Sequence, residues 1–292
     1  MQACVYGADS RPECTAMLLT TSRLFTAALL ALVLASCAAA PRNRAGGIES
    51  ESRLRVVAKE RHRLIRQFTD VGALSELDRF SVPRVELAAD ARGPGISERQ
   101  ASLVANNAGR AACSRLGKYV ELDETGGEDT AEVKLVITGI VPTGRAAAGA
   151  SSVIGLFVPF VPFRLPTGLG ALAGEAEVRA ADRAQLAVMH WARGANSVMN
   201  SAKVSTIGDA WQLAKQFGDQ FARAILDSQP RRNGIQHAPA EPAVRAANRA
   251  LCDRHFGTVN LAGRGASLVL PLSPESIDPG APASSEENAN QP

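Results

Sequence analysis

Four ionisable side chains near the middle of the chain have a spacing that suits acid–base or metal chemistry. Glu175 and Glu177 are separated by one residue, and Asp182 and His190 follow. Residues i and i+2 of a strand share one face, so both glutamates would face the same side, and a histidine on the neighbouring strand can lie opposite them. This pattern is compatible with a weak hydrolase or a metal-binding protein with a site near His190. We favour the alternative that these side chains form the solvated outer face of a sheet.

Other signatures of catalysis are missing from the sequence. It contains no Gly-x-Ser-x-Gly elbow, phosphate loop or dinucleotide fingerprint. His62, His237 and His255 lie in charged or turn-rich surroundings without ligand spacing, and no Cys-x-x-Cys or Cys/His cluster suggests zinc. We therefore expect no enzyme activity, no cofactor and no metal.

The N-terminal stretch indicates where the rest of the chain works. After Met17 come one basic residue, Arg23, the uncharged run 24–33 and the sequence Leu34-Ala35-Ser36-Cys37. This order is typical of a bacterial lipoprotein signal peptide, whose cleavage leaves a diacylated cysteine at position 37. A transmembrane helix needs about 20 apolar residues, and the charge-free run here is shorter. We therefore predict lipidation of Cys37.

The remaining chain divides by composition. A Pro- and Gly-containing stretch after the cysteine is typical of a flexible tether, and the last residues have too little apolar content to fold. We predict a signal peptide over 1–36, with Met17 a plausible start, the lipidated cysteine and tether over 37–48, one folded domain over 49–228, a C-terminal extension over 229–272 and a disordered tail over 273–292.

Charge and cysteine content limit the class of partner and the redox compartment of the protein. The formal net charge is +3 and the basic residues are scattered along the chain, which argues against nucleic acid as a partner. Once Cys37 is acylated, only Cys113 and Cys252 remain in the mature chain. In an oxidising compartment they are a candidate disulfide. The alternative is two buried thiols, because free cysteine packs as a small apolar side chain, and the sequence leaves both open.

An uncharged segment over residues 146–163 is the most unusual part of the chain. It contains Phe157, Phe160 and Phe163, and its prolines and glycine exclude a membrane-spanning helix. An apolar loop of this length is uncommon unless it has a function. One interpretation is a hydrophobic contact surface for acyl chains, a hydrophobic ligand or a partner protein. The other is a loop that covers one face of the sheet.

Hydrophobic periodicity predicts a mixed set of elements. Ser97 is expected to begin a helix with Gln100 in a capping box and Gly117 to end it, and Thr206 to cap a second helix with Asp209. We predict helices over 49–67, 97–116, 206–226 and 242–256, and strands over 80–87, 118–122, 131–141, 174–180, 185–192 and 267–270. The expected fold class is α+β, with an antiparallel sheet of about four or five strands and helices packed on one face.

Several short motifs support a family resemblance. They are the lipobox, Gly174-Glu175-Ala176-Glu177, Asp182, Leu186-Ala187 and Gly208-Asp209-Ala210. Together with the order of elements they resemble a family of uncharacterised bacterial lipoproteins, domain of unknown function family 3313, over roughly residues 54–226. The resemblance implies a periplasmic domain anchored in the outer membrane, with no established activity. Ala38 is not the aspartate that typically retains such proteins at the inner membrane.

These observations together predict a membrane-anchored lipoprotein on the periplasmic face of the outer membrane. We expect a non-catalytic binding or envelope-maintenance module that contacts the membrane through lipidated Cys37 and an envelope protein or hydrophobic ligand through its folded part.

Overall fold

The computed structural model describes residues 39–41, 53–127, 129–144, 169–196, 205–230, 238–260 and 272–281. The chain divides between Ser36 and Cys37 into two compact units, and every described residue belongs to the second unit. Within these ranges, no helix combines the length and the apolar character needed to cross a bilayer.

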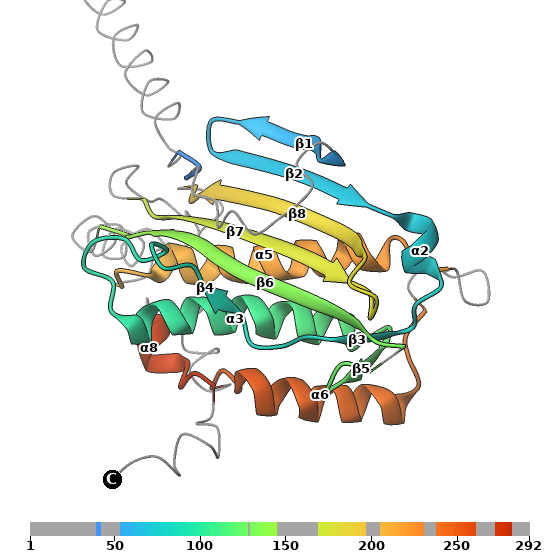
Figure 1. Ribbon diagram of the computed structural model, residues 1–292. Helices are drawn as coiled ribbons and strands as arrows, with labels where there is room; N and C mark the ends of the chain where they lie inside the picture. The colour runs from blue at the N-terminus through green and yellow to red at the C-terminus, as the bar shows by residue number, and fades with distance from the viewer. Residues whose placement is uncertain are drawn as a thin grey trace, which may run out of the picture. The chain divides into compact units, whose positions relative to one another are not determined.

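One mixed sheet of eight strands forms the centre of this unit (Figure 1). The spatial order is β1-β2-β8-β7-β6-β3-β5, and β4 pairs with β6 beside that path. Neighbours from β1 to β6 run antiparallel, whereas β3 and β4 lie parallel to β6, and β5 lies parallel to β3. The strands are β1 (Arg55–Glu60), β2 (Arg63–Thr69), β3 (Arg79–Ser81), β4 (Glu86–Leu87), β5 (Glu121–Asp123), β6 (Ala131–Val141), β7 (Ala171–Arg179) and β8 (Gln185–Gly194).

The mixed α/β character is as predicted, but the predicted antiparallel sheet of four or five strands is wrong in both size and direction. The parallel strands β3, β4 and β5 have only two or three residues each. Segments of that length contain too few alternating apolar and polar residues to predict how they pair. Their pairing depends on the strands beside them.

The first two strands replace a predicted helix over residues 49–67. Ile65 pairs with Trp191 of β8 and is 2% exposed, so joining the sheet buries this side chain against the core. The β-branched residues Val56 and Val57 also favour a strand. Apolar residues in this charged stretch fit both a helical and a strand period. The segment forms a strand because β2 pairs with β8 along its edge.

The long helices α3 and α5 lie on one face of the sheet. In Figure 1, α3 and α5 run side by side behind the strands, and α6 lies along the far side of α3. The helices of the described ranges are α2 (Val71–Ser75), α3 (Glu98–Leu116), α5 (Gly208–Leu226), α6 (Pro242–Phe256) and α8 (Pro274–Ile277).

The predicted helix ends are confirmed for α3 and corrected for α5. Ser97 and Gln100 form the expected capping box, and Gly117 is the C-cap. In contrast, α5 begins after Ile207 without a side-chain cap. The carboxylate of Asp209 binds groups outside the helix instead, as described below.

Small residues allow the helices to approach one another and the sheet. A Cβ atom on Gly218 of α5 would collide with the carbonyl oxygen of Ala108 in α3. A Cβ atom on Gly174 of β7 would lie 2.7 Å from the ring of Phe217. That ring packs against Trp191 with 5.6 Å between centroids, so the two glycines set the spacing of the core.

The last described segment folds, although residues 273–292 were predicted to be a disordered tail. Pro274 and Ile277 of α8 are buried, and Asp278 is 1% exposed. The anchoring of this segment depends on hydrogen bonds to a carboxylate as well as on apolar burial, which a hydrophobicity argument does not detect.

Candidate functional site

The structure brings together two of the four residues that suggested acid–base chemistry. Glu175 and His190 are directly opposite in the β7–β8 pairing, and His190 is also opposite Arg66 of β2. They occupy the face away from α5, because Gly174 next to Glu175 contacts Phe217. Glu175 is 3% exposed and His190 is 9% exposed, so the predicted solvated face is wrong at these positions. Both lie on central strands of the sheet.

The other two residues have structural contacts of their own. Glu177 accepts a hydrogen bond from Gln185 Nε2 at 2.9 Å and lies 3.0 Å from Arg179 Nε. Asp182 accepts from the backbone N–H of Ala184 at 2.9 Å within the β7–β8 turn. In the part of the chain that the structure describes, no three His, Cys, Asp or Glu side chains are grouped to hold a metal ion.

Several predicted residues cannot be placed. Cys37, the contact surface of Phe157, Phe160 and Phe163, and the predicted strand over 267–270 lie outside the described residues. What the structure does describe is the chain on both sides of the uncharged segment.

A single carboxylate joins the described chain before the segment to the described chain after it. Asp209 Oδ2 accepts from the Gly170 N–H at 2.7 Å and from the Thr143 hydroxyl at 3.1 Å. The Thr143 N–H donates to the carbonyl oxygen of Thr206 at 2.7 Å. Asp209 is 1% exposed and lies in the first turn of α5, where the helix dipole favours a negative charge. We call Thr143, Gly170 and Asp209 the loop clamp, because it fixes where residues 145–168 leave and rejoin the sheet.

Sequence reasoning missed the loop clamp because it assigned Asp209 to a capping role. The feature of the sequence that marks this contact is Gly170. A Cβ atom there would lie 2.8 Å from Thr143 Oγ1 and 3.0 Å from Asp209 Cβ, so the close approach of these elements requires glycine.

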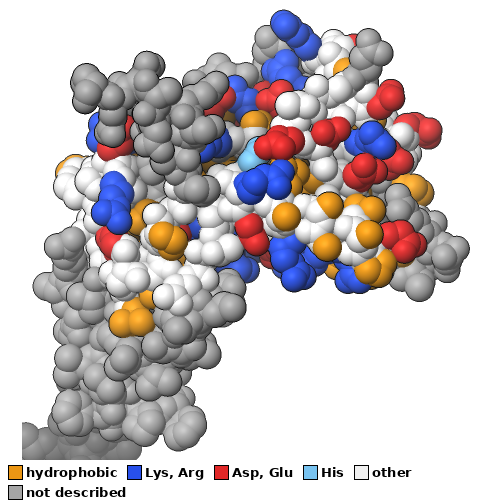
Figure 2. All heavy atoms as spheres, turned by 90° about the horizontal axis from the view of Figure 1, so that it is seen from below, with side chains coloured by type: hydrophobic (Ala, Val, Ile, Leu, Met, Phe, Trp, Pro, Cys, Tyr) orange, Lys and Arg blue, Asp and Glu red, His pale blue; other side chains and the backbone are white. Residues whose placement is uncertain are grey.

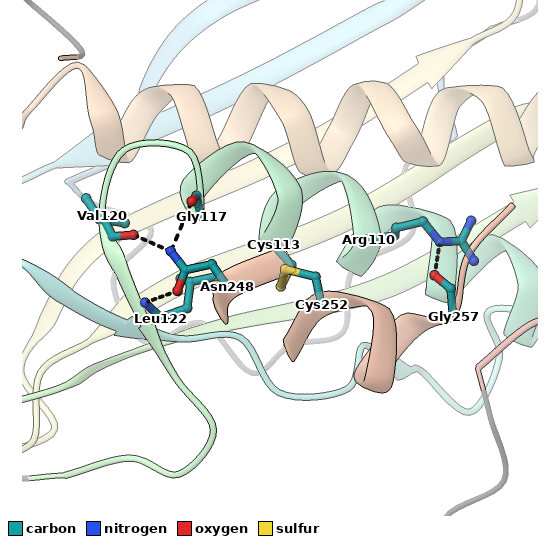
Figure 3. The surroundings of a disulfide bond; sticks show 8 residues. All are labelled: Arg110, Cys113, Gly117, Val120, Leu122, Asn248, Cys252 and Gly257. Carbon is teal, nitrogen blue, oxygen red and sulfur yellow. Dashed lines mark hydrogen bonds between the residues drawn. A yellow bond between two sulfur atoms is a disulfide. The ribbon is translucent and has the colours of Figure 1, made fainter. Parts of the chain in front are cut away.

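Cys113 of α3 and Cys252 of α6 form a disulfide, the first of the two alternatives left open by the sequence (Figure 3). Their Cα atoms are 5.8 Å apart. Next to the bridge, the Asn248 amide donates to the carbonyl oxygens of Gly117 and Val120 and accepts from the Leu122 N–H, at 2.8 to 3.0 Å (Figure 3). The bridge and Asn248 together hold α6 against α3 and β5.

A buried ion pair holds the end of the described chain. Arg110 donates from Nη1 and Nη2 to the two carboxylate oxygens of Asp278, both at 2.9 Å. The Asp278 carboxylate also accepts from Trp211 Nε1 and from the Gly280 N–H, each at 3.0 Å. The Asp278 side chain is fully buried, and these donors satisfy its charge.

Two further carboxylates connect helices at the surface. Burial raises the pKa of Asp219, but hydrogen bonds from Arg115 at 2.7 and 3.0 Å outweigh it and leave the pKa below its ordinary value. Burial likewise raises the pKa of Glu275, and hydrogen bonds from Gln100 and Ser205 reverse that shift and lower it. Both carboxylates therefore favour the folded state when ionised.

A shallow cleft of about 780 Å³ lies between the β5–β6 connection and the β7–β8 turn. Charged side chains of both signs occur among the residues that line it, which include Gly127, Thr130, Glu132, Arg179 and Arg183. This mixture does not select a ligand of one charge.

A family model described as protein of unknown function (DUF3313) matches residues 45–221. The chain belongs to the DUF3313 family. No curated protein matches it. Among solved structures, a variant PelC dodecamer from Paraburkholderia phytofirmans is 12% identical with a TM-score of 0.33, and the PelC dodecamer in another crystal form is 10% identical with a TM-score of 0.35. Each match covers 56% of this chain and 96% of the PelC chain.

In this DUF3313 domain, the motif residues that support the family resemblance have structural contacts. Gly174 makes room for Phe217, Asp182 stabilises the β7–β8 turn, and Asp209 belongs to the loop clamp. Each of these residues positions backbone or core.

Proposed function

We propose that this DUF3313 protein is a lipoprotein anchored through acylated Cys37 to the periplasmic face of the outer membrane, where it acts as a non-catalytic binding or envelope-maintenance module. The lipobox supports the anchor. The observation that carries the proposed location is the disulfide between Cys113 and Cys252. Disulfides of this kind persist outside the cytoplasm and are rare within it.

The proposed binding element is the uncharged segment with Phe157, Phe160 and Phe163. The loop clamp supports this role, because it ties the described residues on the two sides of the segment, Thr143 and Gly170, to Asp209 of α5. A rigid base lowers the entropy that such a segment loses when it binds a partner.

Acylation is tested on protein made in a Gram-negative host. We expect incorporation of a labelled palmitate analogue and an N-terminal peptide mass that corresponds to a lipidated cysteine at position 37. Cys37→Ser should lose the label and keep the leader. A native protein that is unacylated and still carries its leader would refute the proposed location.

The binding role is tested by crosslinking in intact cells. The parent is compared with a variant that has Phe157, Phe160 and Phe163 changed to Ser. A second variant, with the exposed valines Val71 and Val141 changed to Ser, controls for loss of apolar surface elsewhere. We expect envelope crosslinks to disappear only in the phenylalanine variant. The same crosslinks in all three proteins would contradict the proposal.

A hydrolase or metal-binding protein with a site near His190 is the second candidate. It is supported by the direct pairing of His190 with Glu175 on β8 and β7. If this candidate is correct, His190→Ala and Glu175→Gln should each abolish the same hydrolytic activity or bound metal. Equal activity and metal content in parent and variants would exclude it.

A further inference from the structure

The positive charge of the protein is concentrated on the hairpin formed by β1 and β2. Residues 53–66 contain six Lys or Arg and one Glu, a formal charge of +5. The remaining residues contain 26 Lys or Arg and 28 Asp or Glu, a formal charge of −2. The basic residues are therefore not evenly scattered along the chain, and the expectation that they are scattered is wrong for this hairpin. We call residues 53–66 the basic hairpin; its cations are Arg53, Arg55, Lys59, Arg61, Arg63 and Arg66.

Most of this charge is available to an outside partner. Arg55, Lys59 and Arg61 are exposed. The acidic residue of the hairpin, Glu60, lies 2.9 Å from Arg63 Nη2 and 3.3 Å from His62 Nε2. It therefore compensates one cation and leaves a net positive surface.

Apolar side chains accompany these cations. Val56 and Val57 of β1 are 55% and 59% exposed. The guanidinium of Arg53 lies over the ring of Phe68, 4.1 Å from its centroid. Exposed valines between cations suit the boundary between lipid headgroups and acyl chains, where charged groups contact phosphates and apolar groups enter the hydrocarbon.

The described residues that follow the proposed lipid anchor in the sequence contact this hairpin. The N–H of Ala40 donates to the carbonyl oxygen of Arg61, in the β1–β2 turn, at 3.1 Å. Three residues of extended chain span at most about 11 Å, so Cys37 can lie no farther than that from Ala40. This distance is close to the Debye length at physiological ionic strength, about 8 Å. Charges on the turn are therefore within range of headgroup phosphates.

We propose that the basic hairpin binds anionic phospholipid headgroups of the bilayer that holds the acyl chains, and so fixes the orientation of the domain with β1 toward the membrane. This inference rests on the proposed lipidation of Cys37. The side of the molecule formed by α6 has a different character, because basic and acidic side chains are interspersed there (Figure 2). A surface of mixed charge gives no net attraction to an anionic membrane.

The test uses the second compact unit, residues 37–292, with Cys37→Ser so that no acyl chain contributes to binding. Sedimentable vesicles of phosphatidylglycerol and phosphatidylethanolamine are compared with vesicles of phosphatidylcholine. We expect binding to the anionic vesicles alone, weakened by added salt. Substituting Arg55, Lys59 and Arg61 with Gln should reduce the partition coefficient by roughly a hundredfold, because each cation near an anionic surface contributes about 1 kcal/mol.

A matched control removes the same charge from α6. Arg245, Arg249 and Arg254 are exposed, and changing all three to Gln should reduce binding by less than about threefold, because net charge alone acts weakly at a distance. Equal losses in both variants, or no binding of the parent to anionic vesicles, would overturn the proposal. The proposal would also be overturned if the variants that lose vesicle binding lose self-association, measured by sedimentation, to the same extent. Palmitate labelling of the full chain tests the anchor separately, so a failure of the anchor can be distinguished from a failure of headgroup binding.

Discussion

The two ends of the sheet are held by different interactions. At the β5 end, α6 is fixed by a disulfide and by Asn248 (Figure 3), and α8 is fixed by the buried pair of Arg110 and Asp278. At the β1 end, an exposed strand pairs, among the described strands, with β2 alone. The comparison indicates that a disulfide and a satisfied buried charge hold α6 and α8, which pack against α3. In the described part of the chain, the basic hairpin has no disulfide, and its residues Arg55, Lys59 and Arg61 are exposed.

The largest effect is expected from breaking the buried ion pair at the cross-linked end. Asp278→Ala leaves Arg110, whose side chain is 12% exposed, without its carboxylate. We expect the free energy of unfolding to fall by about 4 kcal/mol, as for other buried pairs that lose one partner. Urea unfolding measures this, with Asp182→Ala in the exposed turn as the control. Similar small losses in both variants would show that the Asp278 cluster does not hold this end.

Removing the disulfide is expected to have a somewhat smaller effect. The bridge closes a loop with a sequence separation of 139 residues. Changing Cys113 and Cys252 to Ala should cost about 3 kcal/mol, as is typical for a disulfide, because the unfolded chain is then less constrained. Reduction of the parent with dithiothreitol should lower its unfolding midpoint to that of the variant. A parent whose midpoint does not respond to reductant would contradict the role given to this bridge.

Helix packing supplies the third comparison. Gly218→Ala places a Cβ atom against the carbonyl oxygen of Ala108 and should cost about 2 kcal/mol, because α3 and α5 must separate. Gly126→Ala is the matched control, since nothing lies within 4 Å of a Cβ atom at that position. Thermal unfolding of both variants distinguishes packing from backbone effects. A destabilised Gly126 variant would argue against the packing explanation.

A pH-dependent effect of about 1 kcal/mol is expected from the pair of Arg115 and Asp219. Because the pKa of Asp219 is lowered in the folded state, its stabilisation is complete above the unfolded-state pKa and is lost as the pH falls through the folded-state pKa. Arg115→Met should therefore be less stable than the parent at pH 6, and the difference should shrink below about pH 4. Arg254→Met, at an exposed pair with Glu124, should show no such change. A constant difference across pH would rule out this linkage.

The smallest effect on stability is expected at the basic hairpin. Changing Arg55, Lys59 and Arg61 to Gln should alter the free energy of unfolding by less than about 0.5 kcal/mol, because these side chains are exposed. Urea unfolding checks this in the protein used for vesicle binding. A loss comparable to that of Asp278→Ala would mean that the hairpin is a structural element of the core.

Long periodic segments were predictable, and short or charged ones were not. The bounds of β6 and α6 match the prediction, and the capping box of α3 was visible in Ser97 and Gln100. In the basic hairpin, cations interrupt the apolar pattern, so the sequence fits both a helical and a strand period. A helix was predicted there, and the structure has two strands. Of the candidate acid–base site, the proximity of Glu175 and His190 was predictable from alternation along two strands, but their burial was not.

The amino-acid sequence by itself determined the family, the paired strands β7 and β8, and the main helices, because these depend on local motifs and on periodicity within one segment. Tertiary structure decided the size and direction of the sheet, the place of the basic hairpin at its edge, and the pairing of Arg110 with Asp278. These features depend on contacts between residues far apart in the chain. Their energies come from burial and charge pairing that exist only once the elements have packed together.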